Sequence, residues 1–151
     1  MQKGFNSITI MKDIDRLRKV TELAKESSFV KINGKSVRVG SSIYIGNRWI
    51  SSAVNSNKTN PKVVKYNSIL PFQKTPFLHA EMAAIISAAK KIDIKDFKYC
   101  TLYVARKLKI DGCGLARPCP ACMEAIREYG IPKIIYTTDS GYAVEFIKDI
   151  E

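Results

Sequence analysis

Two short stretches of the sequence combine residues that bind metals with a residue that can move protons. The first is His79-Ala80-Glu81, which contains the single histidine of the chain, and the second is Pro118-Cys119-Pro120-Ala121-Cys122. An imidazole and two thiolates are good ligands for Zn²⁺, and three protein ligands leave the fourth tetrahedral position open for water. We therefore predict an open zinc site formed by His79, Cys119 and Cys122.

The spacing of the two cysteines suits a single metal ion. Both stretches are predicted to lie at helix N-termini, and cysteines three positions apart on a first helical turn point to the same side. The partial positive charge and the free N–H groups of a helix N-terminus favour the thiolate. A neutral imidazole and two thiolates leave Zn²⁺ with a net charge near zero, and in favourable sites the metal lowers the pKa of its water to about 7.

Glu81 is the predicted catalytic residue. It lies two positions after His79, and so on another side of the helix, which makes it a poor fourth ligand. We expect its carboxyl to lie over the open position, where it takes a proton from water and delivers it to the substrate. Burial and a stacked substrate should raise the pKa of this carboxyl, while the nearby metal opposes the shift.

Together, H-x-E and P-C-x-x-C form the signature of the zinc-dependent deaminases, and the chain resembles the cytidine deaminase superfamily. That superfamily includes cytidine, deoxycytidylate, tRNA adenosine and polynucleotide cytidine deaminases. The resemblance implies that His79, Cys119 and Cys122 hold Zn²⁺. It implies that Glu81 is the proton shuttle, and that Asn55 binds the sugar or the base. The alternative for Asn55 is an asparagine that caps a loop.

Two further residues near the motifs are predicted to contact the substrate. Ala80 lies between the predicted ligand and the proton carrier, and Phe77 lies in the loop before them. Phe72 and Phe77 are candidates for stacking on a ring, although an apolar staple on the helix start is the plainer interpretation. The segment 58–61 resembles a motif of some superfamily members, for which we have no physical account.

The apolar periodicity predicts the elements that position these residues. They are a helix over Ile14–Ser27, strands Val37–Ile45 and Trp49–Val54 around a Gly46-Asn47 turn, a loop over Asn55–Pro71, a helix over Leu78–Lys91, a strand over Tyr99–Ala105, a loop over Arg106–Arg117, a helix over Pro118–Tyr129, and strands Lys133–Thr138 and Tyr142–Ile147.

This order predicts one domain over residues 1–151 with a three-layer α/β/α sandwich. Strand–helix–strand connections imply parallel neighbours, and the short turn 139–141 makes the last two strands an antiparallel hairpin. We expect a mixed five-stranded sheet, which agrees with the cytidine deaminase-like fold that the resemblance implies.

Composition narrows the class of protein. The net charge of +11 comes from 25 Lys and Arg against 14 Asp and Glu, and favours an anionic partner such as a nucleotide or nucleic acid. The alternative is lysine scattered over solvated faces.

No apolar run approaches the ~20 residues of a membrane span, and residues 1–11 do not form a secretory signal. We expect a cytoplasmic protein without a membrane partner, whose four cysteines are thiols or metal ligands.

The predicted reaction is hydrolytic deamination of a free cytosine nucleoside or nucleotide (cytidine, deoxycytidine, CMP or dCMP) to the uracil form with release of ammonia. The short turn before the last strand resembles that of the nucleoside deaminases, whereas the long Arg106–Arg117 loop differs from the corresponding segment of those enzymes.

One alternative is a cytidine or adenosine deaminase of single-stranded DNA or tRNA. Another is a non-catalytic zinc-binding module that interacts with nucleic acid or protein. A structural zinc site, in which Cys100 or Cys113 is the fourth ligand, is a separate alternative to the open site. Relatives often form dimers or tetramers, which implies a homo-oligomer.

Overall fold

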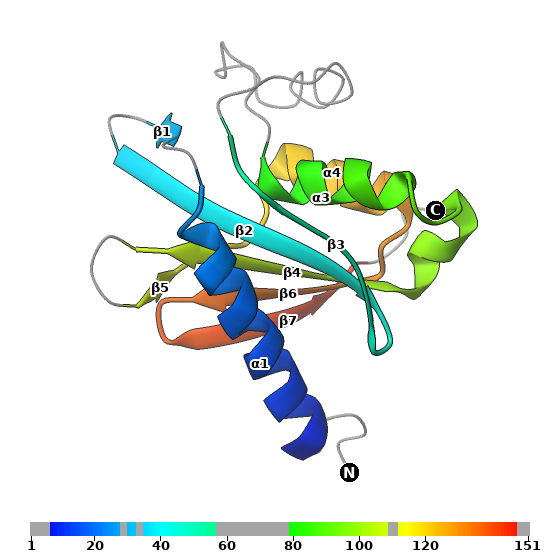
Figure 1. Ribbon diagram of the computed structural model, residues 1–151, viewed down its shortest axis with the longest axis horizontal. Helices are drawn as coiled ribbons and strands as arrows, with labels where there is room; N and C mark the ends of the chain where they lie inside the picture. Colours follow the sequence, from blue (N-terminus) through cyan, green and yellow to red (C-terminus); the bar gives the residue numbers. More distant parts are fainter. Residues whose placement is uncertain (1–6, 28–29, 33–34, 57–78, 109–111, 148–151) are drawn as a thin grey trace.

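The computed structural model describes residues 7–27, 30–32, 35–56, 79–108 and 112–147. Its strands are β1 (Val30–Ile32), β2 (Lys35–Ile45), β3 (Arg48–Val54), β4 (Cys100–Lys107), β5 (Cys113–Gly114), β6 (Lys133–Thr138) and β7 (Gly141–Phe146). Its helices are α1 (Ser7–Ala24), α3 (Ala80–Ala89), α4 (Pro120–Tyr129) and the 3₁₀ helix η1 (Ile94–Tyr99). The strands form one mixed sheet in the order β1-β2-β4-β6-β7, with β3 paired to β2 and β5 paired to β4 (Figure 1).

The pairing confirms the mixed sheet and the final hairpin. Strand β2 is antiparallel to β3 and to β4, β4 is parallel to β6, and β6 is antiparallel to β7. One expectation was wrong, because β3 and β4, which α3 connects, are not neighbours. Residues 40–45 of β2 pair with both strands, so β2 lies between them. The tight hairpin places β3 on one edge of β2 and leaves the other edge to β4.

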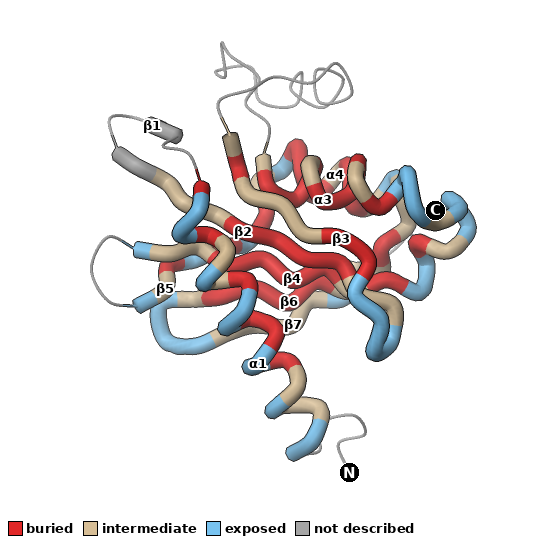
Figure 2. Tube along the Cα trace, viewed as in Figure 1, coloured by how far each residue is buried: buried red, intermediate tan, exposed pale blue. Residues whose placement is uncertain are grey.

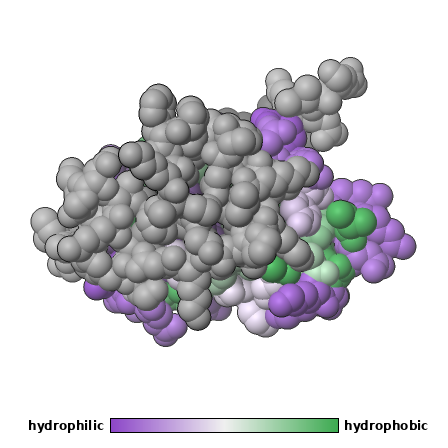
Figure 3. Space-filling view, turned by 90° about the horizontal axis from the view of Figure 1, so that it is seen from above, coloured by the Kyte–Doolittle hydropathy of each residue, from purple (hydrophilic) through white to green (hydrophobic). Residues whose placement is uncertain are grey.

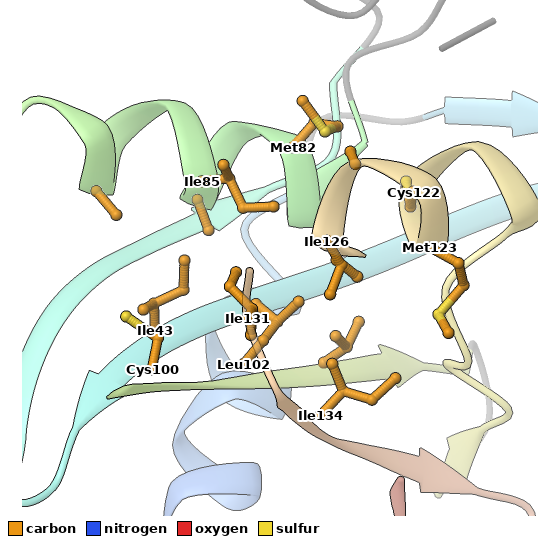
Figure 4. Packing of buried hydrophobic residues seen from close by; sticks show 14 of the residues in the cluster. Ile43, Met82, Ile85, Cys100, Leu102, Cys122, Met123, Ile126, Ile131 and Ile134 are labelled. Carbon is orange, nitrogen blue, oxygen red and sulfur yellow. The ribbon is translucent and has the colours of Figure 1, made fainter. Parts of the chain in front are cut away.

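Helices cover both faces of the sheet, which confirms the three layers. Helix α1 lies on one face, and α3 and α4 lie on the other (Figure 1). Because side chains alternate along a strand, Leu102 and Val104 of β4 pack in the core under α3 and α4, while Tyr103 and Ala105 pack in the cluster with α1. The central strands are buried along most of their length (Figure 2), and isoleucine, leucine and methionine side chains fill the α3–α4 side (Figure 4).

Several element bounds differ from those predicted. The predicted Arg106–Arg117 loop contains the end of β4 and the short strand β5, which the sequence pattern does not indicate. Helix α4 begins at Pro120 rather than Pro118, since Cys119 takes the N-cap position. Of the predicted loop over 55–71, only Asn55 and Ser56 lie within the described residues. In the described ranges, no helix is both long enough and apolar enough to span a membrane.

Candidate metal centre

The metal-ligating residues come together because two helices begin beside each other. His79 is the N-cap of α3 and Cys119 is the N-cap of α4, each with an extended backbone conformation, and Cys122 follows in the first turn of α4. Pro120 occupies the first helical position of α4, where the N–H that proline lacks would have no partner within the helix. The two helix starts thus direct their side chains into a shared space.

The distances fit one zinc ion. The Nδ1 atom of His79 lies 3.6 Å from Cys119 Sγ and 3.3 Å from Cys122 Sγ. All three ligand atoms lie within 4.8 Å of one another. Tetrahedral bonds of about 2.0–2.3 Å to Zn²⁺ hold ligand atoms roughly 3.5 Å apart. These side chains are therefore close enough to bind a common ion.

The protonation of the three side chains is coupled. The Cys122 thiol lies against the Cys119 sulfur, and this hydrogen bond, together with that from His79, lowers the pKa of Cys119 to about 4. The pKa of Cys122 is raised well above its ordinary value. The contact with Cys119 is the largest cause of this rise, and burial is the second. The hydrogen bond to Cys119 raises the pKa of His79. Zinc binding needs both thiolates and a neutral imidazole, so it should release the protons that the cluster shares.

Glu81 lies beside this cluster in the first turn of α3. Its side chain is buried, with 6% of the residue exposed. Burial raises the pKa of its carboxyl, and the positive charge of His79 opposes the shift. A hydrogen bond with Glu81 also contributes to the high pKa of Cys122. The structure thus places a buried acid with a raised pKa beside the metal ligands, as proton transfer near neutral pH requires.

The two other cysteines lie away from the cluster. Cys113 Sγ is 3.6 Å from Thr21 Oγ1 of α1, and α1 covers the opposite face of the sheet. Cys100 is buried at the C-cap of η1, where its thiol donates to the carbonyl of Asp96 at 3.7 Å. Within the described part of the chain, the metal-ligating group contains no fourth His, Cys, Asp or Glu. This arrangement favours an open site over a closed structural one.

Asn55 has a well-defined set of partners at the end of β3. Its side-chain amide donates to the Val37 carbonyl at 2.9 Å, and its Oδ1 accepts from the Val39 N–H at 3.0 Å and from the hydroxyl of Ser27. These bonds tie the end of β3 to β2, as a loop-capping asparagine does. The substrate-binding role of Asn55 stays a prediction.

The remaining predicted substrate contacts have different surroundings. Ala80 is fully buried, and its carbonyl accepts a hydrogen bond from the hydroxyl of Ser41 at 2.6 Å. Phe72, Phe77 and the segment 58–61 lie outside the described residues. The contact from Ser41 was not predicted. The available signal was the presence of paired serines in the middle of both strands of the hairpin, among apolar residues.

Comparisons with known proteins agree with this geometry. The family model described as "Cytidine and deoxycytidylate deaminase zinc-binding region" matches residues 11–138. No curated protein matched the chain. The fold is similar to that of the apo dCMP deaminase from the cyanophage S-TIM5, with a TM-score of 0.56, 17% identity, and coverage of 85% of this chain and 83% of that one.

A second similar structure is the cytidine deaminase from Burkholderia pseudomallei, with a TM-score of 0.56 and 14% identity, covering 95% of this chain and 94% of that one. At such identities the two structures support the fold alone, whereas the family match includes all three predicted ligands and Glu81. The chain therefore belongs to the cytidine and deoxycytidylate deaminases and carries the zinc-binding region of that family.

Proposed function

We propose that the protein hydrolyses the exocyclic amine of a free cytosine nucleoside or nucleotide, giving the uracil form and ammonia. The family supports a zinc deaminase of cytosine compounds. The observation that carries the proposal is the buried carboxyl of Glu81, with its raised pKa, beside a three-ligand metal cluster. A purely structural zinc site has no use for such a carboxyl.

The residues divide the work between metal binding and proton transfer. Zn²⁺ held by His79, Cys119 and Cys122 would supply a Lewis acid that lowers the pKa of water. Glu81 accepts a proton from the attacking water and donates it to a ring nitrogen of the base. It then takes the proton of the hydroxyl newly formed on the ring carbon and passes it to the amino group, so that the carbon–nitrogen bond breaks, ammonia leaves and the carbonyl forms; one carboxyl thus acts in turn as base and as acid. Its burial keeps bulk water from competing for these protons.

Release of ammonia tests the proposal directly. The zinc-loaded protein is assayed on cytosine, cytidine, deoxycytidine, CMP, dCMP and single-stranded oligonucleotides. Glu81→Gln should retain zinc and lose roughly 10²–10⁴-fold in kcat, because the proton transfers lose their carrier. The control is Glu22→Gln, which changes an exposed glutamate of α1 whose side chain is 65% exposed. Equal activity of the parent and Glu81→Gln would contradict the role of Glu81.

The net charge of +11 favours a second candidate, deamination of a base in a polynucleotide. Among the residues that Figure 3 colours, at the margins of this face, hydrophilic side chains border a few apolar ones. Polynucleotide binding should weaken steeply as salt rises, whereas turnover of uncharged cytidine should respond little. If nucleosides and their monophosphates are inert while a single-stranded oligonucleotide is deaminated, the free-substrate proposal fails.

A zinc module without activity is the remaining alternative, and inertness of the parent protein on the whole panel would favour it. The expected cytoplasmic location and homo-oligomer stay predictions. Light scattering of the zinc-loaded protein measures its oligomeric state.

A further inference from the structure

Two buried hydroxyl groups of the β2–β3 hairpin contact the backbone of α3. Ser41 Oγ donates to the Ala80 carbonyl at 2.6 Å, and Ser51 Oγ donates to the Ala84 carbonyl at 2.8 Å. Both serines are 0% exposed. The accepting carbonyls are four residues apart, so they lie one above the other along one side of the helix. The hairpin therefore holds α3 at two points one helical turn apart.

These two contacts differ in kind from the apolar packing around them. Apolar side chains such as Ile43 and Ile85 supply the core between the hairpin and α3 (Figure 4). Apolar attraction has no preferred direction, so it resists a small slide or rotation of a helix only weakly. Hydrogen bonds depend on distance and angle. Two of them on one side of α3 restrict both its rotation and its position along the axis.

The first contact falls on the functional motif itself. The Ala80 carbonyl belongs to the peptide that joins Ala80 to Glu81, and His79 immediately precedes it. A shift of this peptide moves the imidazole and the carboxyl together. Metal–ligand distances tolerate only about 0.2 Å, which makes such a shift costly for zinc binding.

We propose that Ser41 and Ser51 are positioning residues of the metal centre. By holding the Ala80 and Ala84 carbonyls, they place His79 against the two cysteines of α4 and place Glu81 beside them. The inference deepens the proposed function and rests on it for the role of Glu81. The arrangement of His79 and the cysteines stands on the distances alone.

Zinc affinity tests this without any substrate. Ser41→Ala and Ser51→Ala are compared with the parent by chelator competition, and by the absorption spectrum of the cobalt-substituted protein. We expect zinc affinity to fall about tenfold in Ser41→Ala and less in Ser51→Ala, in the range seen when groups that orient metal ligands are removed. The cobalt bands should shift in both variants, because the ligand angles change.

The matched control is Ser42→Ala. Ser42 is buried on the same strand, but its hydroxyl bonds to that of Ser52 at 2.6 Å on the other face of the hairpin. Its zinc affinity should stay within about twofold of the parent. If Ser41→Ala does not fold, Ser41→Cys keeps a weaker donor in a similar volume and should show an intermediate affinity.

Parent-like zinc affinity and cobalt spectra in both Ser41→Ala and Ser51→Ala would overturn the inference. Such a result leaves the deaminase proposal standing. Conversely, full activity of Glu81→Gln contradicts the proposed function while leaving the zinc measurements interpretable.

Discussion

At the residue scale, identical cysteine side chains acquire different chemistry from their neighbours. Thiolates react with iodoacetamide and thiols do not. Because the pKa of Cys119 is held at about 4, we expect its alkylation in the metal-free protein to change little between about pH 6 and pH 8. Burial raises the pKa of Cys100 to about 11, so it should stay unmodified over this range. Peptide mapping by mass spectrometry measures both rates.

Two controls isolate the folded environment. In denaturant, both cysteines should react at the same rate, and that rate should rise with pH as for an ordinary thiol. Zinc should protect Cys119 in the folded protein because the sulfur becomes a ligand. An alkylation rate at Cys119 that rises about tenfold per pH unit in the folded protein would contradict the lowered pKa.

The sequence predicted that His79, Cys119 and Cys122 form one cluster because the two motifs that contain them are recognisable, while the proton-shuttle role of Glu81 stays a prediction. Only the pairing of the two sulfurs is local, since cysteines spaced three apart at a helix start face the same side. His79 lies 40 and 43 positions away from them, and its place in the cluster was implied by the family resemblance. The surroundings of Asn55 and Ser41 could not be predicted in the same way. Their partners lie 16–28 and 39 positions away and belong to no recognisable motif, so they depend on the hairpin register and on where α3 packs.

At the element scale, α1 lies so close to β2 that one position cannot hold a side chain. A Cβ at Gly40 would lie 2.7 Å from the Val20 carbonyl oxygen and 3.1 Å from the Ala24 nitrogen, both backbone atoms. Gly40→Ala should therefore force α1 away from the sheet and lower the free energy of unfolding by about 1–3 kcal/mol. Urea unfolding measures this loss.

Gly46→Asn is the control for that substitution. Gly46 has a φ of 57° and no atom within 4 Å of a built Cβ, and asparagine tolerates this left-handed conformation. Its effect should be the smaller of the two. If Gly40→Ala is no less stable than Gly46→Asn, the backbone of α1 does not approach Gly40 closely enough to exclude a side chain.

An ion pair joins β7 to the segment before Cys119. Arg117 donates from Nε and Nη2 to the two carboxylate oxygens of Glu145, each at 3.0 Å. These bonds lower the pKa of Glu145. A lowered folded pKa stabilises the protein above the unfolded value, near 4.5, and this stabilisation is lost as the pH falls through the folded value.

Glu145→Gln should accordingly destabilise the protein near neutral pH, and only there. Because the pair is partly exposed, the expected loss is below about 1 kcal/mol. The difference from the parent should shrink between about pH 7 and about pH 2, as the pH falls through the lowered pKa of Glu145, because a protonated glutamic acid is neutral like the glutamine. Urea unfolding at the two pH values measures it, and a difference that grows in acid would contradict the pairing.

The elements that the sequence predicted best are those with strong local signals. The Gly46-Asn47 turn and the strand over residues 133–138 lie where their patterns place them. The short strands β1 and β5 carry no periodicity of their own. Strand β5 exists because Cys113 and Gly114 pair with the end of β4. Both Pro118 and Pro120 could be the first residue of α4, and the sequence alone does not show that Cys119 is the N-cap.

At the scale of the whole molecule, one sheet joins the two helical layers. Strand β4 contributes alternate side chains to the cores on both of its faces. Unfolding of β4 would therefore expose the core under α1 and the core under α3 and α4 together. The metal centre lies on the α3–α4 side, between helices that contribute to one apolar core. Folding and zinc binding should thus be one linked equilibrium.

We therefore expect the chain to unfold as a single cooperative domain whose midpoint zinc raises. Circular dichroism, which reports the whole sheet, and fluorescence of the single tryptophan, Trp49 on β3, should give coincident transitions.

Free zinc at about 100 times its Kd should add about 2.7 kcal/mol to the free energy of unfolding, which raises the midpoint temperature by roughly 5–10 °C for a chain of this size. Cys119→Ser should unfold in one step but lose the shift, because only two ligands remain. Separate transitions for the two probes would mean that the β2–β3 hairpin unfolds independently of the sheet, and an equal zinc shift in Cys119→Ser would place the bound ion elsewhere.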